Sequence, residues 1–309
     1  MKKTVLIIFA AVVVIAAPIY FIIPATLTVS NQLTIEASDG VVAKFLTHQQ
    51  RWDKWWPGTK INENQFAYDG VQLTINKTTN GGVNVDLQQG SFKINADINY
   101  LAGDFSAKVT LVGKKQSSMN PIQRVTEYFA ARGLQNKTRQ VLARFKTFLE
   151  DQKNAYGYKI YINKVTDPFL LTKTASTATY PDMQSIYSSI ENLKKEAIAK
   201  GAKMTNFPML NITQVGSKEY QVSYAIPIDK KITPGKGSII NNLVMGGNLL
   251  IADVKGGPNT VNDAFEEVRM YMKDHKLVAP AMPFESMVTD RYLEKDTSKW
   301  VTKIYSPIF

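Results

Sequence analysis

The sequence predicts an α+β chain in three parts: an N-terminal transmembrane helix, a sheet packed against one long helix, and a duplicated strand–helix–strand–strand module. Three observations predict this order. An uncharged apolar run fills residues 4–23. Period-two alternation in residues 66–112 precedes a helical pattern that ends near residue 154. The order strand, helix, strand, strand then occurs twice in residues 158–309.

The apolar run Thr4–Ile23 predicts a membrane anchor, assigned to residues 1–25. A helix of this length covers about 30 Å, the thickness of a bilayer's hydrocarbon core. The lysines at positions 2 and 3 favour the cytoplasmic side, which makes the chain single-pass, with a periplasmic or cell-surface soluble part. A signal peptide cleaved after Ala16 is the alternative. The anchor is favoured because the apolar run continues through residues 19–23.

Composition excludes several classes of function. The chain has no cysteine, so disulfides, lipid-modified cysteines and cysteine metal sites are excluded. Its only histidines, His48 and His275, fall in different predicted domains, so neither a metal centre nor a Ser-His triad is expected, and no cofactor is assigned. The formal net charge of +11 is spread along the chain, which favours a solvated basic surface over nucleic-acid binding.

Residues 26–154 predict a bent sheet crossed by a long helix, with a cavity between them. A β-branched strand at residues 26–35 is followed by a short helix that Ser38 or Asp39 can cap. The antiparallel meander comes next, and Asn120-Pro121 opens the long helix. Trp52, Trp55 and Trp56 have two interpretations: they line a ligand mouth or dip into a membrane interface, or they pack the loop against the core.

This order resembles the START-like (SRPBCC, polyketide cyclase-like) superfamily of helix-grip proteins. The residues that carry the resemblance are the segment Ile35–Val42, the tryptophan turn Trp52–Gly58 and the helix end Leu142–Glu150. The resemblance implies a helix-grip domain over residues 26–154 whose cavity encloses an apolar ligand.

The second half contains an internal repeat. In the first copy, a strand at Phe169–Thr177 and a helix at about 182–200 precede strands near 207–213 and 220–228. In the second copy, Gly247–Lys255 and a helix at about 260–275 precede strands near 282–290 and 300–308. Such a duplication predicts a pseudo-twofold pair of sheets joined edge to edge, with a groove between the halves.

The ending of this module resembles the GyrI-like, or AraC-type effector-binding, family over residues 155–309. The matching residues are Phe284-Glu285, Asp290, Trp300 and Pro307-Ile308. The resemblance implies that Glu285 lies at the floor of an aromatic-lined pocket. Met287 stands where the family commonly has tyrosine, and Lys303 where it commonly has an acid, so the pocket is less suited to dicationic drugs.

The candidate ligand-binding residues combine this glutamate with aromatic side chains that can supply a stacking or cation–π wall. They are Glu285, Trp300, Phe284, Tyr180, Tyr187, Tyr224 and Tyr305. The leading hypothesis is a membrane-anchored protein that binds a small amphipathic, lipophilic or cationic molecule here. One alternative is a hydrolase of small electrophilic compounds with Glu285 as base, and another is an envelope scaffold. A transcription factor is rejected because the first 150 residues predict no helix-turn-helix.

Overall fold

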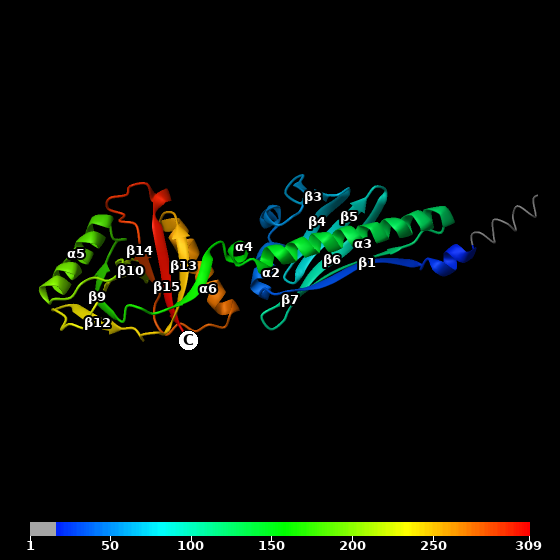
Figure 1. Ribbon diagram of the computed structural model, residues 1–309. Helices are drawn as coiled ribbons and strands as arrows, with labels where there is room; N and C mark the ends of the chain where they lie inside the picture. The colour runs from blue at the N-terminus through cyan, green and yellow to red at the C-terminus, as the bar shows by residue number, and fades with distance from the viewer. Residues whose placement is uncertain (1–16) are drawn as a thin grey trace, which may run out of the picture. The chain divides into compact units, whose positions relative to one another are not determined.

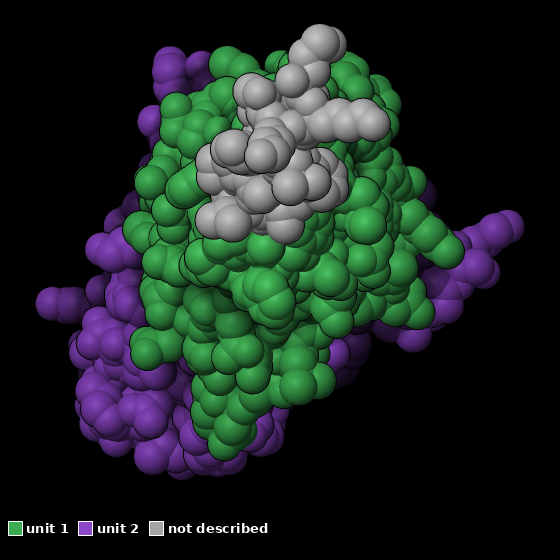
Figure 2. Space-filling model, turned by 90° about the vertical axis from the view of Figure 1, so that its right-hand side faces the viewer, with its two compact units in different colours: residues 1–155 green, residues 156–309 purple. Residues whose placement is uncertain are grey.

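The computed structural model describes residues 17–309. The chain divides into two compact units, residues 1–155 and residues 156–309, which are coloured separately in Figure 2. Both units combine one antiparallel sheet with helices, and Figure 1 labels their elements. Each unit is therefore an α+β body, as the sequence predicts.

The fold prediction is corrected at the N-terminus. No helix in residues 17–309 is both long enough and apolar enough to cross a membrane. Most of the predicted helix, residues 4–16, lies outside the described residues, and residues 17–22 are helical. This end is tied to the first unit: Arg124 Nη2 donates a hydrogen bond to the Ile23 carbonyl at 2.6 Å, and the Tyr20 hydroxyl donates to the Met119 carbonyl at 2.5 Å.

The first unit is a seven-stranded antiparallel sheet in the order β1-β7-β6-β5-β4-β3-β2. Its strands are β1 Thr26–Ile35, β2 Thr59–Lys60, β3 Gln65–Tyr68, β4 Val71–Thr79, β5 Gly82–Gln89, β6 Phe92–Ala102 and β7 Ala107–Gln116. Its helices are α2 Asp39–Leu46, the 3-10 turn η1 Gln49–Lys54 and α3 Pro121–Glu150, and α4 Gln152–Tyr156 runs to the unit boundary. The side chains of Ser38 and Asn120 cap α2 and α3.

The three clustered tryptophans belong to the core of this unit, which supports the packing interpretation. Trp52, Trp55 and Trp56 are 0%, 1% and 8% exposed. Each indole N–H donates a hydrogen bond to a backbone carbonyl, at Leu46, Phe45 and Ala67 respectively. Burial of an indole needs such a partner, and all three find one.

The space between sheet and helix is nearly filled by these side chains. Trp55 and Trp56 line it together with Leu87, Leu111 and Leu142. What remains holds on the order of one water molecule. An apolar ligand of the size expected for a helix-grip cavity therefore requires these side chains to move.

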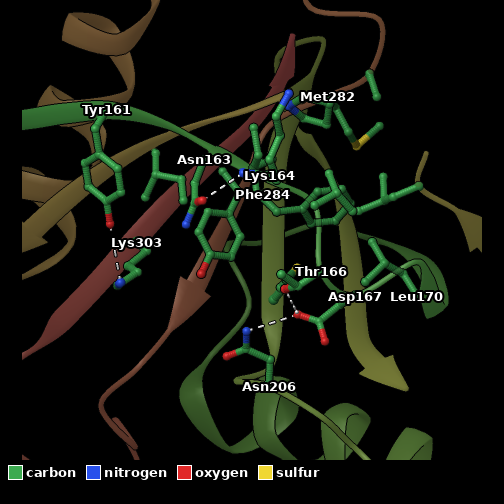
Figure 3. Close-up of a pocket in the computed structure, with 18 residues that line it drawn as sticks. Tyr161, Asn163, Lys164, Thr166, Asp167, Leu170, Asn206, Met282, Phe284 and Lys303 are labelled. Atoms are coloured by element: carbon green, nitrogen blue, oxygen red, sulfur yellow. Dashed lines mark hydrogen bonds between the residues drawn. The ribbon is translucent and has the colours of Figure 1, made fainter. Parts of the chain in front are cut away.

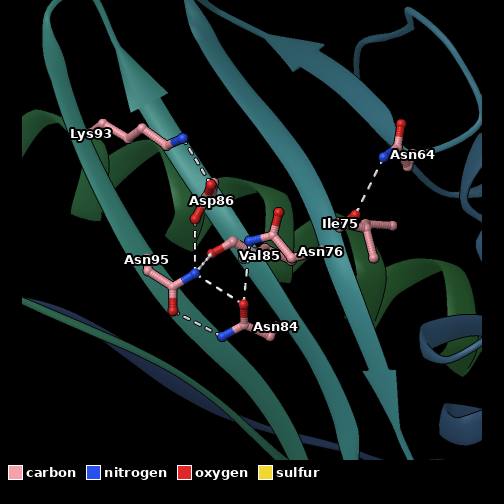
Figure 4. A network of polar contacts seen from close by, with 8 residues as sticks. All are labelled: Asn64, Ile75, Asn76, Asn84, Val85, Asp86, Lys93 and Asn95. Atoms are coloured by element: carbon pink, nitrogen blue, oxygen red, sulfur yellow. Dashed lines mark hydrogen bonds and ion pairs between the residues drawn. The ribbon is translucent and has the colours of Figure 1, made fainter.

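The opposite face of the same sheet is polar (Figure 4). Along β6 the residues alternate strictly between buried and exposed from Phe92 to Asn99. On the exposed side, the amide of Asn95 donates to Asn84 at 2.9 Å and to Asp86 at 2.8 Å. That hydrogen bond, with the Lys93 ammonium at 2.8 Å, holds the pKa of Asp86 below its ordinary value.

The second unit is an eight-stranded antiparallel sheet in the order β12-β9-β11-β10-β14-β15-β13-β8. Its elements are β8 Lys159–Lys164, β9 Phe169–Thr177, α5 Met183–Ala199, β10 Met209–Val215, β11 Glu219–Ile228, β12 Ser238–Asn242, β13 Asn248–Lys255, α6 Pro258–Asp274, β14 Phe284–Met287, η2 Thr297–Lys299 and β15 Val301–Ile308. The runs β9-α5-β10-β11 and β13-α6-β14-β15 are the two copies that the sequence predicts. They join through β10 and β14 at the centre of the sheet.

The two faces of this sheet differ because both helices cover the same one. Ile186, Ile190 and Leu193 of α5 pack with Leu210 and Tyr224 of the sheet. α6 packs on β13 and β15, where Leu250 and Ala252 are fully buried. We call this the helix face and the other side the open face. Side chains alternate along each strand, so neighbouring residues fall on opposite faces.

Replacing Phe145 by Ala in the full chain tests the packing of the first unit. Phe145 is fully buried, with its ring 4.3 Å from that of Trp55. We expect the free energy of unfolding to fall by about 3–5 kcal/mol. Urea titration followed by tryptophan fluorescence measures it, since three of the four tryptophans lie in this core.

The matched control is Phe129→Ala on the same helix, because Phe129 is 67% exposed. Its free energy of unfolding should stay within about 0.5 kcal/mol of that of the unmodified chain. Equal losses for the two variants would contradict the described packing of α3.

Candidate functional site

A cavity opens on the open face of the second unit (Figure 3). Its volume is about 180 Å³, and the empty space rises to about 840 Å³ when the solvent at its opening is counted. Most of its walls are apolar, and the apolar lining residues are Val165, Leu170, Met209, Leu243, Leu249, Ile251, Ala281, Met282, Phe284, Tyr305 and Pro307. An apolar groove with Val244, Pro280 and Phe309 adjoins it through shared lining residues. The cavity and the groove together make a continuous apolar surface.

Strand register explains why these residues converge. Phe284 pairs with Tyr305, and Tyr305 pairs with Ile251 across the next ladder. Directly opposed residues in antiparallel strands point to the same face. Met209 pairs with Ser286, two residues beyond Phe284 on the same face. The cavity thus spans the junction of the two copies.

One polar group in the cavity wall comes from the second copy and its flanking strand β8. The Lys303 ammonium lies 3.5 Å from the Tyr161 hydroxyl and 3.8 Å from the Asp253 carboxylate. The Tyr161 hydroxyl donates a hydrogen bond to that carboxylate at 3.2 Å. Burial alone lowers the pKa of Lys303, but Tyr161 and Asp253 outweigh it and raise the pKa above its ordinary value. Lys303 is therefore a cation at neutral pH.

The second polar group comes from loops of the first copy. Asp167 accepts hydrogen bonds from the Thr205 hydroxyl at 2.6 Å and from the Asn206 amide at 3.1 Å. The Thr166 hydroxyl contacts the same carboxylate at 3.3 Å. Lys164, at the rim, donates to the Asn248 amide oxygen at 2.7 Å. The Asp167 carboxylate is thus well supplied with donors from its own chain.

The structure places Glu285 on the helix face, away from this cavity. It pairs with Ile304 and Leu210, whose side chains are buried beneath the helices. Its carboxylate lies 2.6 Å from Arg291 Nη2, and the two side chains are 10% and 4% exposed. The charge of Glu285 is therefore matched inside the chain.

Arg291 is a residue that sequence reasoning missed. Its Nη2 also donates to the Thr302 hydroxyl at 2.8 Å, and its guanidinium lies 5.0 Å from the Trp300 ring centre. Its backbone N–H donates to the Tyr187 hydroxyl at 2.6 Å. The guanidinium therefore occupies the aromatic and acidic surroundings in which the sequence predicted an external cation.

The predicted ligand-binding residues fall into three groups. Glu285, Trp300 and Tyr187 meet around Arg291. Tyr224 is 3% exposed and lies in the core beneath α5, and half-exposed Tyr180 stands edge-on to Tyr220. Burial, and then the charge of Glu285, raise the pKa of Tyr180. Phe284 and Tyr305 alone line the cavity on the open face.

Within residues 17–309 no group of three acidic or histidine side chains could hold a metal ion. The cavity walls offer hydrogen-bonding groups and the partly exposed Lys303 ammonium, and the helix face offers a closed ion pair. The sequence did not predict a shared site for three polar residues of the cavity, because they come from segments far apart in the chain. These residues are Tyr161, Asn206 and Lys303.

Comparisons with known proteins give similarity to solved structures alone. No family model and no curated protein matches the chain. The crystal structure of the EcmrR C-terminal domain matches with 14% sequence identity and a TM-score of 0.41, and covers 49% of this chain and 98% of that chain. SAV2435 bound to tetraphenylphosphonium matches with 12% identity and a TM-score of 0.32, covering 49% and 94%. An uncharacterized conserved protein from Listeria innocua matches with 10% identity and a TM-score of 0.37, covering 52% and 98%.

Every one of these TM-scores is below 0.5, so function must be argued from the site itself. The strand–helix–strand–strand order found twice in the second unit is the order that the GyrI-like resemblance implies. The comparisons do not show a START-like domain in residues 26–154.

Replacing Arg291 by Met tests the buried ion pair. The variant leaves the Glu285 carboxylate buried without its partner, and breaking such a pair costs about 3–5 kcal/mol. We expect the free energy of unfolding to fall by this amount in chemical denaturation. The double variant Arg291→Met/Glu285→Gln should recover most of the loss, because no buried charge remains.

Arg269→Ala is the control, since the Arg269–Glu266 pair is 64% and 68% exposed. Its unfolding midpoint should hardly move. A double variant no more stable than Arg291→Met would contradict the ion-pair interpretation.

Proposed function

We propose that the second unit binds a small amphipathic molecule in the cavity of its open face. The observation that carries the proposal is the cavity itself, with apolar walls and separate polar groups supplied by the two copies. The cavity and the groove that adjoins it have volumes of about 180 Å³ and 510 Å³, and together they lie within the range of about 300–1,000 Å³ typical of small-molecule sites. Such sites combine apolar walls with a few placed polar groups.

The apolar walls supply affinity and the polar groups supply orientation. Leu249, Ile251 and Phe284 present aliphatic and aromatic surface to a ligand chain. Burial of that surface yields roughly 25 cal/mol per Å² before the cost of association. Lys303 lies in the wall of the second copy and Asp167 in that of the first, so a polar head meets different chemistry in each direction.

The hydrolase hypothesis gains no support from this geometry. Glu285 lies on the opposite face from the cavity, and its carboxylate bonds to Arg291. A molecule in the cavity would not meet that carboxylate. Binding in place of catalysis is therefore the function that we propose.

Blocking the cavity opening tests the proposal. Ala281 is exposed at the rim, so Ala281→Trp adds an indole over the opening without disturbing the core. We expect the full chain to bind Nile red with saturable fluorescence that decanol displaces. The Ala281→Trp variant should bind at least about tenfold more weakly, because most of the surface of a ligand is buried in such a site.

The control is Ala279→Trp in the same loop, exposed and outside the cavity lining. It should bind like the unmodified chain. Equal affinity of the two tryptophan variants, or no saturable binding, would overturn the proposal.

A further inference from the structure

The polar groups of the cavity differ in how fully their hydrogen bonds are used. Among the described residues, the polar contacts of the Lys303 ammonium are the Tyr161 hydroxyl at 3.5 Å and the Asp253 carboxylate at 3.8 Å. The second distance is beyond hydrogen-bond range. An ammonium group carries three donors. Lys303 therefore keeps donors that the chain does not satisfy at good distance.

Tyr161 and Asp253 are engaged with each other more closely than with the lysine. The hydroxyl proton of Tyr161 points to the carboxylate at 3.2 Å, which leaves the phenolic oxygen as an acceptor towards Lys303. The Lys303 side chain is 36% exposed, so its ammonium is reached from the cavity. A stronger acceptor that entered the cavity would gain the spare donors of Lys303.

The Asp167 carboxylate of the cavity, unlike the Lys303 ammonium, already has hydrogen-bond partners at short distance. Asp167 already receives hydrogen bonds from Thr205 and Asn206. A cationic or donor-rich ligand would have to compete with these bonds. Spare donors at Lys303 and occupied acceptors at Asp167 favour a ligand head that accepts hydrogen bonds.

We infer that the cavity takes an amphipathic carboxylate, with its acid group on Lys303 and its apolar chain against Ile251, Leu249 and Phe284. This inference rests on the proposed function and names the ligand class of the same site. A single ammonium flanked by the Tyr161 phenol and the Asp253 carboxylate can offer its spare donors to one head group with a single negative charge. Lys164 adds a second positive charge at the rim, where its contact is a neutral amide.

Isothermal titration of the full chain with three ligands of equal chain length tests the inference: decanoate, decanol and decylamine. We expect decanoate to bind about tenfold more tightly than decanol at low salt, because it adds a charge-assisted hydrogen bond. The preference should shrink as salt is added. Decylamine should bind more weakly than decanol.

Two variants of the lysine site sharpen the test. Lys303→Met keeps most of the aliphatic length of the side chain without its charge, and it should reduce decanoate affinity to that of decanol, with decanol affinity unchanged. Asp253→Asn removes the carboxylate that competes for Lys303, so decanoate should bind severalfold more tightly. A purely structural role for the Lys303–Asp253 pair would instead weaken all three ligands in both variants.

Lys255→Met is the matched control, because Lys255 lies on β13 two residues from Asp253 and does not line the cavity. It should leave the decanoate preference intact. Equal affinity for decanoate and decanol in the unmodified chain, or a preference for decylamine, overturns the carboxylate inference while the proposed function stands. Failure of all three ligands to bind, with Nile red also unbound, overturns both.

Discussion

The pairing of β10 with β14 is the contact on which the second unit depends. It consists of the pairs Met209–Ser286 and Leu210–Glu285, and it turns two strand–helix–strand–strand copies into one sheet. Because the joined sheet is continuous, every strand near the junction has one side beneath the helices and one side open. The cavity is the open side of that junction, and the Glu285–Arg291 pair lies on its covered side.

The covered side shows how a buried acid is accommodated without a ligand. Removing a carboxylate from water costs several kcal/mol unless a partner compensates it. Here Arg291 supplies the opposite charge, Thr302 takes one more of its donors and Trp300 offers a ring face. The loop between β14 and β15 is thereby fixed to the sheet at its arginine. The open side has no such closure, and its cation remains available.

Much of the second unit could be predicted from sequence, because its order of elements repeats and its strands alternate. The site was harder to predict. Phe284 and Glu285 were placed in one pocket although neighbouring strand residues point to opposite faces. Arg291 was missed because its position is set by an irregular loop, and Tyr161 because it comes from an added edge strand. The sequence allowed the tryptophans of the first unit either to line a ligand mouth or contact a membrane, or to pack in the core. Only their burial and their hydrogen bonds to backbone carbonyls decide for the core. Within residues 17–309 no helix is long and apolar enough to cross a membrane, and most of the apolar run that predicted the anchor lies outside these residues.

The duplication is not symmetric in chemistry. The segment Pro208-Met209 of the first copy can be aligned with Pro283-Phe284 of the second. The strand registers then place Ser223 at the position of Lys303, and Thr174 at the position of Asp253. The hydroxyls of Ser223 and Thr174 share a hydrogen bond at 3.1 Å, so this pair carries no charge. Two equivalent positions of the sheet thus carry a neutral hydroxyl pair in one copy and a charged pair in the other. If the two copies were chemically identical, a molecule lying across the pseudo-twofold axis could bind in two equivalent orientations. The difference between the copies makes these orientations unequal.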